Sequence, residues 1–266
     1  VRHVSAGLRR VHLDFNINPW KKKKIFDLGD VPLPYANNNE RCIEDITNFY
    51  TKIANSKKPV VSIGGDHSIT GGILQGLGSN NLEMTKGKKI SFLHIDAHTD
   101  TFTQLDHFMG AKKSAAHWGA YLVDQGIIDP KTSMQIGMRG NPRSLDWLQP
   151  SYDLGYNVVT MEEFQKRGMK DVIDQTLEKI GDNPVYITFD LDSLDATVAP
   201  AVSNIEPGFT GFTIDEAKTL IQSVKNKNVI GGDVVCLMPT KDHKNNITSM
   251  VAASIMFEII SVIAFK

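Results

Sequence analysis

The chain has 266 residues, of which 41% are hydrophobic and 22% are charged, and its formal net charge at pH 7 is -1. This balance can bury a substantial core and favours one α/β domain over residues 1–266 rather than two small ones. The near-zero charge provides no field that would attract nucleic acid or an anionic membrane surface, so neither partner is expected.

The two cysteines, Cys42 and Cys236, are far apart and belong to no spaced motif. A disulfide framework is therefore not expected, and a reducing, cytoplasmic compartment fits. The longest apolar run, near Val251–Phe265, is interrupted by Glu258 and two serines. It predicts a core helix rather than a membrane span.

The N-terminal part has weak patterns. Ala6–Leu13 could form a helical turn or two, and Ile25–Val31 predicts a short strand that ends at a proline-containing loop. The four lysines at 21–24 have no aromatic residues interleaved with them, so we expect a solvated edge rather than a nucleic-acid contact.

From Cys42 onward, strand-like and helix-like segments alternate. The predicted strands are Pro59–Ile63, Ile90–Ile95, Ser133–Met138, Asn157–Val159, Val185–Phe189 and Val229–Leu237. The predicted helices are Cys42–Ile53, Ile69–Leu77, Leu145–Trp147, Glu162–Ile180, Asp215–Val224 and Ile247–Ala264. This alternation predicts an α/β fold with a largely parallel sheet and helices on both sides.

One predicted strand, Ile90–Ile95, ends abruptly in Asp96, His98 and Asp100. Side chains alternate along a strand, so these three would share one side if the extended geometry continued. Two carboxylates and an imidazole suit a divalent cation such as Mn²⁺ or Zn²⁺. Solvated loop acids beside an ordinary histidine are the alternative for this stretch taken alone.

Two other strands end in similar residues. Val185–Phe189 is followed by Asp190 and Asp192, and Pro59–Ile63 is followed by two glycines and His67. Binding sites in open α/β sheets form beyond the carboxyl ends of the strands, so the three groups can converge. Four clustered carboxylates repel one another, whereas two divalent cations remove that cost and can activate a bridging water.

The three stretches resemble the signature blocks of the ureohydrolase family, which includes arginase, agmatinase, guanidinobutyrase and formimidoylglutamase. The matching blocks are Gly64–Ser68, Asp96–Asp100 and Asp190–Asp195. The resemblance implies a three-layer α/β/α fold around a parallel sheet and two Mn²⁺ ions in each chain. It also implies a small guanidino substrate and a homo-oligomer, commonly a trimer or hexamer.

The resemblance also implies roles for six residues. His67 and Asp100 would bind one ion, His98 and Asp192 would bind the other, and Asp96 and Asp190 would bridge them. A bridging hydroxide would attack the amidino carbon, and the tetrahedral intermediate would collapse to urea and an amine.

The loop after the second block resembles the agmatinase-like form, in which a His-Gly pair lies near the substrate. On this basis His117 is assigned as a proton shuttle or substrate contact, and His107 is the weaker candidate. A neutral imidazole near pH 7 suits proton transfer to a departing amine. The predicted catalytic residues are His117 and the metal ligand Asp100, whereas His94 is expected to be a packed core residue.

The substrate side departs from the family. Cys236 lies where the family has a glutamate that pairs with the guanidinium, and loss of such a carboxylate would weaken binding by about 2–5 kcal/mol. The turn at 199–204 is also atypical. The predicted substrate contacts are His117, Asn204 and Cys236, and Glu206 could substitute for the missing acid.

The beginning of the chain differs as well. Arg2–Arg10 resembles the start of the family's first conserved helix, and the strand that normally precedes it would lie before Val1. We therefore expect a single ureohydrolase domain without the family's N-terminal strand.

The leading hypothesis is a Mn²⁺-dependent amidinohydrolase of the agmatinase-like branch that cleaves agmatine or a guanidino acid to urea. Two alternatives stay open. One is a formimidoylglutamase-type hydrolase that releases formamide. The other is a catalytically weak, metal-binding regulatory homologue, for which Cys236 is the main support.

Overall fold

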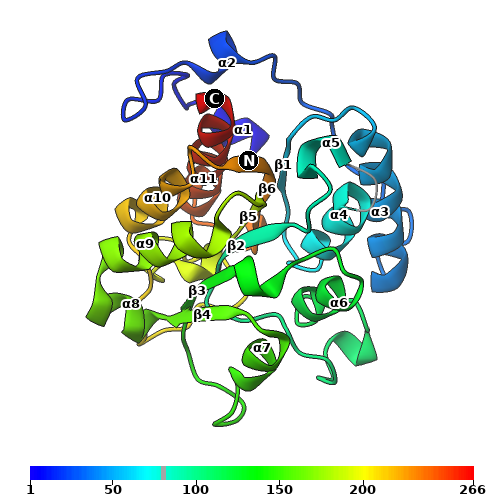
Figure 1. The fold of residues 1–266 in the computed structure, drawn as a ribbon. Coiled ribbons are helices and arrows are strands. Elements are labelled where there is room, and N and C mark those ends of the chain that lie inside the picture. Colours follow the sequence, from blue (N-terminus) through cyan, green and yellow to red (C-terminus); the bar gives the residue numbers. More distant parts are fainter. Residues whose placement is uncertain (79–81) are drawn as a thin grey trace.

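The computed structural model describes residues 1–78 and 82–266, and this part of the chain contains one six-stranded sheet (Figure 1). All of its strand pairs are parallel, and the strands lie in the order β1-β6-β5-β2-β3-β4. Their bounds are β1 Val60–Ile63, β2 Ser91–Ile95, β3 Met134–Met138, β4 Asn157–Thr160, β5 Pro184–Asp190 and β6 Asn228–Val235. Strands β2, β3 and β5 are buried throughout, as expected for a parallel sheet covered on both faces.

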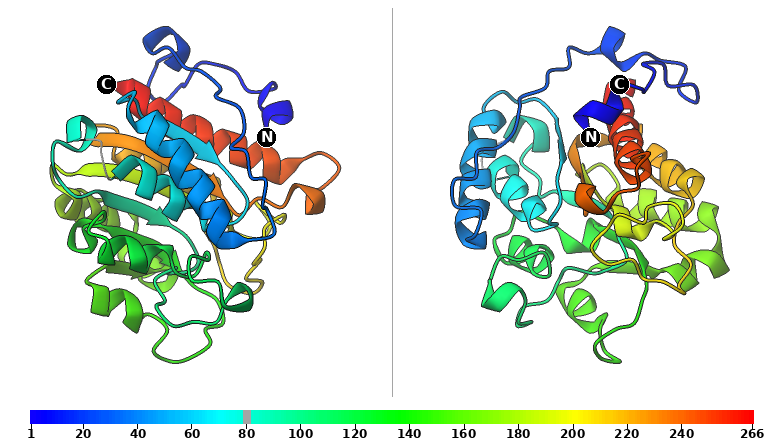
Figure 2. Two further views of the ribbon diagram at one scale, coloured as in Figure 1. Left: turned by 90° about the vertical axis from the view of Figure 1, so that its right-hand side faces the viewer. Right: turned by 180° about the vertical axis from the view of Figure 1, so that it is seen from behind.

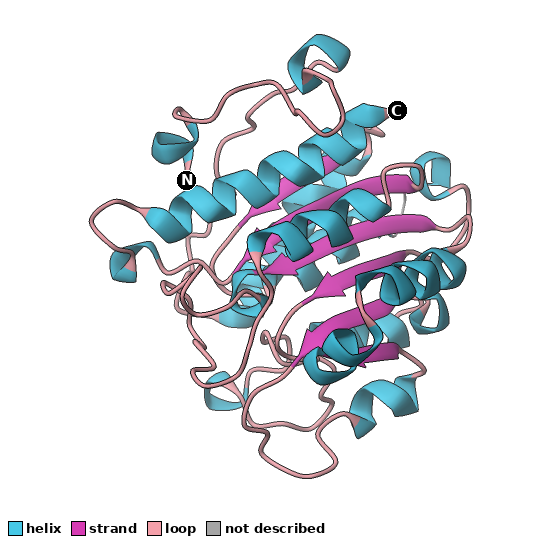
Figure 3. Cartoon of the chain, turned by 90° about the vertical axis from the view of Figure 1, so that its left-hand side faces the viewer, coloured by secondary structure: helices cyan, strands magenta, loops and turns pink. Residues whose placement is uncertain are grey.

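Helices cover both faces of this sheet, so the predicted three-layer α/β/α architecture is confirmed (Figures 1 and 3). One face carries α3 Asn39–Ala54, α4 Ile69–Gly78 and α6 Trp118–Asp124, which pack around Phe92 and Tyr186. The other carries α8 Met161–Arg167, α9 Met169–Ile180, α10 Ile214–Ser223 and α11 Ile247–Phe265, which pack around Ile187 and Phe189. Shorter helices are α1 Arg2–Ser5, α2 Pro19–Lys22, α5 Leu82–Thr85 and α7 Gln149–Leu154.

Helix α11 is long and apolar enough to cross a membrane, with a mean hydropathy of 2.0, and is the one such helix in residues 1–78 and 82–266. Most of its most apolar stretch is nevertheless buried within the fold, where Ile255, Ile259 and Val262 join the core on one face of the sheet. The helix therefore has the burial expected of a core helix, as the sequence predicted.

The bounds of two predicted helices are wrong for local reasons. The stretch predicted as one helix over Glu162–Ile180 is two helices, because Gly168 between α8 and α9 has a φ of +85° that L-residues rarely adopt. The helix predicted at Leu145–Trp147 begins instead at Gln149. Pro150 lies in its first turn, where the backbone N–H that proline lacks would have no partner within the helix.

Two N-terminal predictions are also wrong. The helical turns placed at Ala6–Leu13 lie earlier, in α1, and residues 6–13 form no helix. Ile25–Val31 is not a strand, although its residues line a cavity of about 2580 Å³ that β1 also lines. The cavity separates this segment from the sheet, so its backbone cannot form hydrogen bonds with a neighbouring strand.

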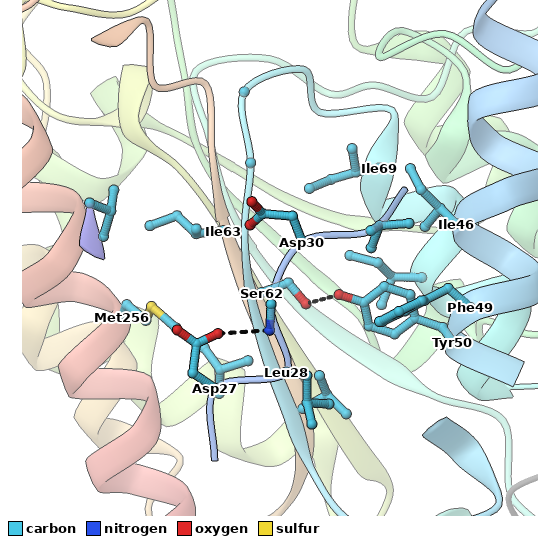
Figure 4. A pocket seen from close by; sticks show the side chains of 18 of the residues that line it. Asp27, Leu28, Asp30, Ile46, Phe49, Tyr50, Ser62, Ile63, Ile69 and Met256 are labelled. Atoms are coloured by element: carbon cyan, nitrogen blue, oxygen red, sulfur yellow. Dashed lines mark hydrogen bonds between the residues drawn. The ribbon is translucent and has the colours of Figure 1, made fainter. Parts of the chain in front are cut away.

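This cavity lies between the N-terminal segment, α3, β1 and α11 (Figure 4). Its walls include Ile46 of α3, Ile63 of β1 and Met256 of α11. The N-terminal segment passes over α11 (Figure 2) and is tied together by Arg2, whose guanidinium lies 2.7 Å from carboxylate oxygens of both Asp27 and Asp30. In the described part of the chain, β1 is an edge strand of the sheet, since the strand order begins with it.

Candidate metal centre

The predicted ligands lie at the carboxyl ends of three strands that the sheet order brings close together. His67 follows β1, Asp96 follows β2, and Asp190 ends β5. The sheet order places β6 between β1 and β5, with β2 on the far side of β5. The loops after β1, β2, β5 and β6 can therefore meet, as expected at the carboxyl edge of a parallel sheet.

The first group surrounds His67. Its Nδ1 atom lies 3.0 Å from Asp96 Oδ2, 3.0 Å from Asp100 Oδ2 and 3.2 Å from Asp190 Oδ2. Burial alone would lower the pKa of His67, but its close interactions with Asp100, Asp190 and Asp96 raise it well above the usual range. The group therefore favours a positive charge at Nδ1.

The second group surrounds His98, whose Nδ1 lies 3.2 Å from Asp192 Oδ2 and 3.5 Å from Asp96 Oδ1. Asp96 thus presents one carboxylate oxygen to each histidine. Burial, followed by the charges of Asp190 and Asp96, raises the pKa of Asp192 well above its ordinary value. The cluster is consequently destabilised by its own negative charge, and a cation would relieve that repulsion.

Hydrogen bonds at the opposite side of the His67 ring hold it in this orientation. The Thr188 hydroxyl donates to Asp233 Oδ1 at 2.7 Å, so its oxygen accepts from His67 Nε2 at 2.8 Å. Asp233 also accepts hydrogen bonds from Thr70 and Tyr186. When the ring is neutral and its proton is on Nε2, the Nδ1 lone pair is directed toward the acids, an arrangement typical of histidine metal ligands.

His98 repeats this arrangement with a different partner. Its Nε2 lies 3.2 Å from Glu206 Oε1, which can accept the ring proton and leave Nδ1 directed at Asp192 and Asp96. This side is more open, because the His98 side chain is 32% exposed whereas that of His67 is 3% exposed. The His98 side is therefore the side of the cluster that is open to solvent.

The donor set fits divalent cations. His67 Nδ1 is buried and forms no hydrogen bond with acceptable geometry, although three carboxylates lie within about 3 Å. Two sets of residues could each hold an ion. Within each set, His67/His94/Asp96/Asp100 and Asp96/His98/Asp192, the ligand atoms lie within 4.8 Å of one another. Imidazole and carboxylate ligands suit Mn²⁺ or Zn²⁺, and the shared Asp96 suits two neighbouring ions.

Cys236, immediately after β6, belongs to a third set in which ligand atoms of Asp190, Asp192 and Cys236 lie within 4.8 Å of one another. Its sulfur lies 2.8 Å from Ser203 Oγ and 3.7 Å from Asp192 Oδ2. Burial, and then the charges of Asp190 and Asp192, raise the pKa of its thiol. Cys236 is 7% exposed and lies beside Asp190 and Asp192.

The other predicted substrate and proton-transfer residues are not gathered as closely. His117 is buried at the start of α6, where Nδ1 lies 2.8 Å from Ser114 Oγ and Nε2 lies 2.9 Å from the Leu105 carbonyl oxygen. His107 contacts the same serine. Burial lowers the pKa of His117, which favours its neutral form. Asn204 is exposed in the loop that leads to Glu206.

His94 is fully buried, as predicted, but it also contacts the cluster. Its Nε2 lies 2.7 Å from Asp96 Oδ2, and its Nδ1 lies 3.1 Å from the Gln135 amide nitrogen. His94 can therefore orient Asp96 from within the sheet.

Several supporting residues could not be recognised from the sequence, namely Thr188, Asp233, Trp118 and Arg139. The Trp118 indole donates to Asp100 Oδ2 at 2.9 Å, and Gly119 allows α6 to approach, since a Cβ atom there would lie 2.9 Å from the Asp100 carbonyl oxygen. Arg139 donates to the carbonyl oxygens of Asp192, Ser193 and Leu194. It thereby fixes the turn that presents Asp192.

The chain is similar to known proteins over most of its length. The chain is 32% identical to human mitochondrial guanidino acid hydrolase, over 98% of this chain and 70% of that protein. It is also 32% identical to mitochondrial agmatinase from Gallus gallus, over 99% of this chain and 74% of that protein. The structure of proclavaminate amidino hydrolase from Streptomyces clavuligerus superposes with a TM-score of 0.87 at 28% identity, over 99% of this chain and 83% of that one. The arginase family profile matches residues 1–261, and the chain belongs to the arginase family.

Proposed function

We propose that this protein is a binuclear-metal amidinohydrolase that cleaves a guanidino compound to urea and an amine. The observation that carries the proposal is the pair of histidine groups that share Asp96, one oxygen of which is directed at His67 and the other at His98. Membership of the arginase family supports it, as do relatives named for guanidino acids and agmatine.

The two groups, together with the family resemblance, support an assignment of the residues that would hold two Mn²⁺ ions. His67 and Asp100 would bind one ion, His98 and Asp192 would bind the other, and Asp96 and Asp190 would lie between them. A bound pair of divalent ions supplies a water that ionises near neutral pH. Asp96 and Asp190 are buried, so bulk water is excluded from this region and electrostatic interactions there are stronger than in solvent.

The protein's own groups would bind and orient the cationic substrate. Glu206 is a partly exposed carboxylate beside His98, and its interactions with His98 lower its pKa despite some burial. It remains negatively charged at neutral pH and would attract the amidinium group. Cys236 cannot fill this role as a carboxylate would, because burial raises the pKa of its thiol and keeps it neutral at neutral pH.

His117 would transfer a proton to the departing amine. Its lowered pKa keeps the imidazole neutral, so it can accept a proton from solvent and then donate one. Both of its ring nitrogens are engaged with Ser114 and Leu105. The role therefore requires its contact with the Leu105 carbonyl to open when substrate binds.

The test is urea release by the Mn²⁺-loaded protein from agmatine, arginine, guanidinobutyrate, guanidinopropionate and guanidine, with the EDTA-treated protein as control. Turnover of one compound, lost on metal removal and restored by Mn²⁺, is the expected result. Absence of urea from every compound, despite two bound ions, would contradict the proposal.

A second candidate is a catalytically weak, metal-binding regulatory homologue. It is favoured by Cys236, which takes the place of the carboxylate expected to pair with the guanidinium group. Absence of urea while two ions bind would support it, unless formamide is released from formimidoylglutamate, which is the result expected of a formimidoylglutamase-type hydrolase.

A further inference from the structure

We propose that Cys236 is a thiolate ligand on the Asp190–Asp192 side of the metal centre, and that it shifts the preference of this chain from Mn²⁺ toward a thiophilic ion such as Zn²⁺. The inference rests on the proposed metal pair. It adds a ligand and a metal preference to that pair.

The Cys236 sulfur lies close to a proposed ligand of one ion. Asp192 Oδ2 lies 3.2 Å from His98 Nδ1 and 3.7 Å from Cys236 Sγ, so one oxygen has the imidazole and the sulfur as close neighbours. A sulfur and an oxygen bound to one tetrahedral ion, at about 2.3 and 2.1 Å, are about 3.6 Å apart. The observed separation is that of an S–H···O hydrogen bond, and it also brings both atoms close enough to bind a single ion.

The sulfur of Cys236 is buried beside two carboxylates, Asp190 and Asp192, and this set of three residues adjoins both histidine groups through these acids. His67 Nδ1, in the adjoining group, is buried without a hydrogen-bond partner and lies 3.2 Å from Asp190 Oδ2. A cation beside Cys236 would compensate Asp190 and Asp192, and a second cation in the adjoining group would satisfy His67 Nδ1.

The position of the sulfur is fixed by its neighbours. The Ser203 hydroxyl oxygen lies 2.8 Å from the Cys236 sulfur. A bridge between Val202 and Leu237 holds the two segments together, and the Cys236 N–H donates to the Gly65 carbonyl oxygen at 2.6 Å. The sulfur is therefore fixed between the loop that carries His67 and the loop that carries Ser203.

Binding of a metal ion by Cys236 requires no oxidant or reductant. The Cys236 thiol loses its proton to solvent as the sulfur–metal bond forms, and no electrons are exchanged with another group. Thiolate ligands select Zn²⁺ and related ions over Mn²⁺, which prefers oxygen donors. One extra sulfur ligand therefore changes the choice of metal without changing the histidine groups.

The experiment is an absorption titration of the metal-free protein with Co²⁺, which reports two features separately. Visible ligand-field bands show that the ion occupies the centre, and a near-ultraviolet thiolate-to-cobalt band shows a sulfur ligand. We expect both in the unmodified protein and in Cys42→Ser, the matched control that removes the other cysteine. In Cys236→Ser, we expect the ligand-field bands to remain and the thiolate band to be lost.

Competition between Zn²⁺ and Mn²⁺ provides the second readout. The Zn²⁺-to-Mn²⁺ preference should fall at least about 10-fold in Cys236→Ser, since even outer-shell changes alter metal affinity by 10–100-fold. An unchanged preference would contradict the inference. Cys236→Ala serves if the serine variant does not fold.

The outcomes separate the two proposals. Ligand-field bands without a thiolate band in the unmodified protein would overturn the role of Cys236 and leave the metal pair standing. A thiolate band that survives in Cys236→Ser and disappears in Cys42→Ser would also overturn it. Absence of both features would remove the metal pair and this inference together.

Discussion

The two histidine groups differ in how rigidly they are held. The His67 ring is buried, and Thr188 and Asp233, both within the sheet, orient it. The His98 ring is partly exposed, and it is oriented by Glu206 from a surface loop. The difference indicates that the His67 side is held by the sheet itself, whereas the orientation of His98 can change with the loop that carries Glu206.

Removal of the residue that joins the two sides should have the largest effect. Asp96→Asn keeps the size of the side chain but removes the charge shared between His67 and His98. Mn²⁺ affinity should fall by more than about 100-fold at both positions, and activity should disappear with it. Calorimetric titration and urea release measure the two losses.

Asp195→Asn is the matched control, because Asp195 is a nearby acid whose carboxylate accepts hydrogen bonds from Thr197 and Gly211 in its own loop region. It should keep both ions. Full turnover by Asp96→Asn would contradict the prediction, because neither histidine group would then depend on the carboxylate that they share.

A change within the sheet should separate the two sides. Thr188→Val preserves the side-chain shape but removes the oxygen that accepts from His67 Nε2. The ion on the His67 side should bind about 10–100-fold more weakly, as for other outer-shell partners of metal ligands, and the other ion should change less. A two-site calorimetric titration with Mn²⁺ resolves the difference.

Thr70→Val is the control for that change. Thr70 also donates to Asp233, at 2.9 Å, but its side chain has no hydrogen bond to His67 in the described part of the chain. Its replacement should leave the binding of both ions nearly unchanged. Equal weakening at the two positions in Thr188→Val would show that the His67 side is not held independently.

Removal of metal should expose a pH dependence on the His67 side. In the metal-free protein the folded-state pKa of His67 is raised, so the folded protein holds a proton more tightly than the unfolded chain. The resulting stability is fully present below about pH 6.5, the unfolded value, and is lost as pH rises through the raised pKa. A tenfold difference in proton affinity between the folded and unfolded states corresponds to about 1.4 kcal/mol of stability.

The measurement is urea denaturation of the EDTA-treated protein across this pH range, compared with His67→Gln. The difference in free energy of unfolding between the two proteins should shrink as pH rises. With Mn²⁺ bound, His67 Nδ1 no longer takes up the proton, so this part of the pH dependence should be absent. A difference that grows with pH in the metal-free proteins would contradict the assignment.

The acids of the cluster are easier to recognise in the sequence than the residues that support them, for a physical reason. Asp96 and Asp190 stand out because each ends a buried apolar strand, where an unpaired charge would be costly. Thr188 and Asp233 lie inside such strands, and their role depends on register, since β5 and β6 pair Thr188 with Asp233. Pairing between distant strands cannot be derived from local alternation.

The N-terminal segment illustrates the same limit. Ile25–Val31 has the apolar residues of a strand, but a strand also needs a neighbour that offers a ladder of hydrogen bonds. The cavity beside β1 removes that neighbour, and the segment remains irregular. Local composition predicted the tendency, and tertiary packing decided the outcome.

The smallest effect is expected on the open side. Glu206→Gln keeps an oxygen that can accept from His98 Nε2 but removes the negative charge proposed to attract a cationic substrate. Because the Glu206 side chain is 20% exposed, solvent screens part of this attraction, and its loss should cost about 1 kcal/mol or less. KM for agmatine should therefore rise up to about 5-fold, while kcat and Mn²⁺ binding change little. Steady-state kinetics with agmatine, compared with Glu206→Asp, tests this, because the shorter acid keeps the charge. A fall in kcat with unchanged KM would instead make Glu206 part of the orientation of His98, and the open side would then be as rigid as the buried one.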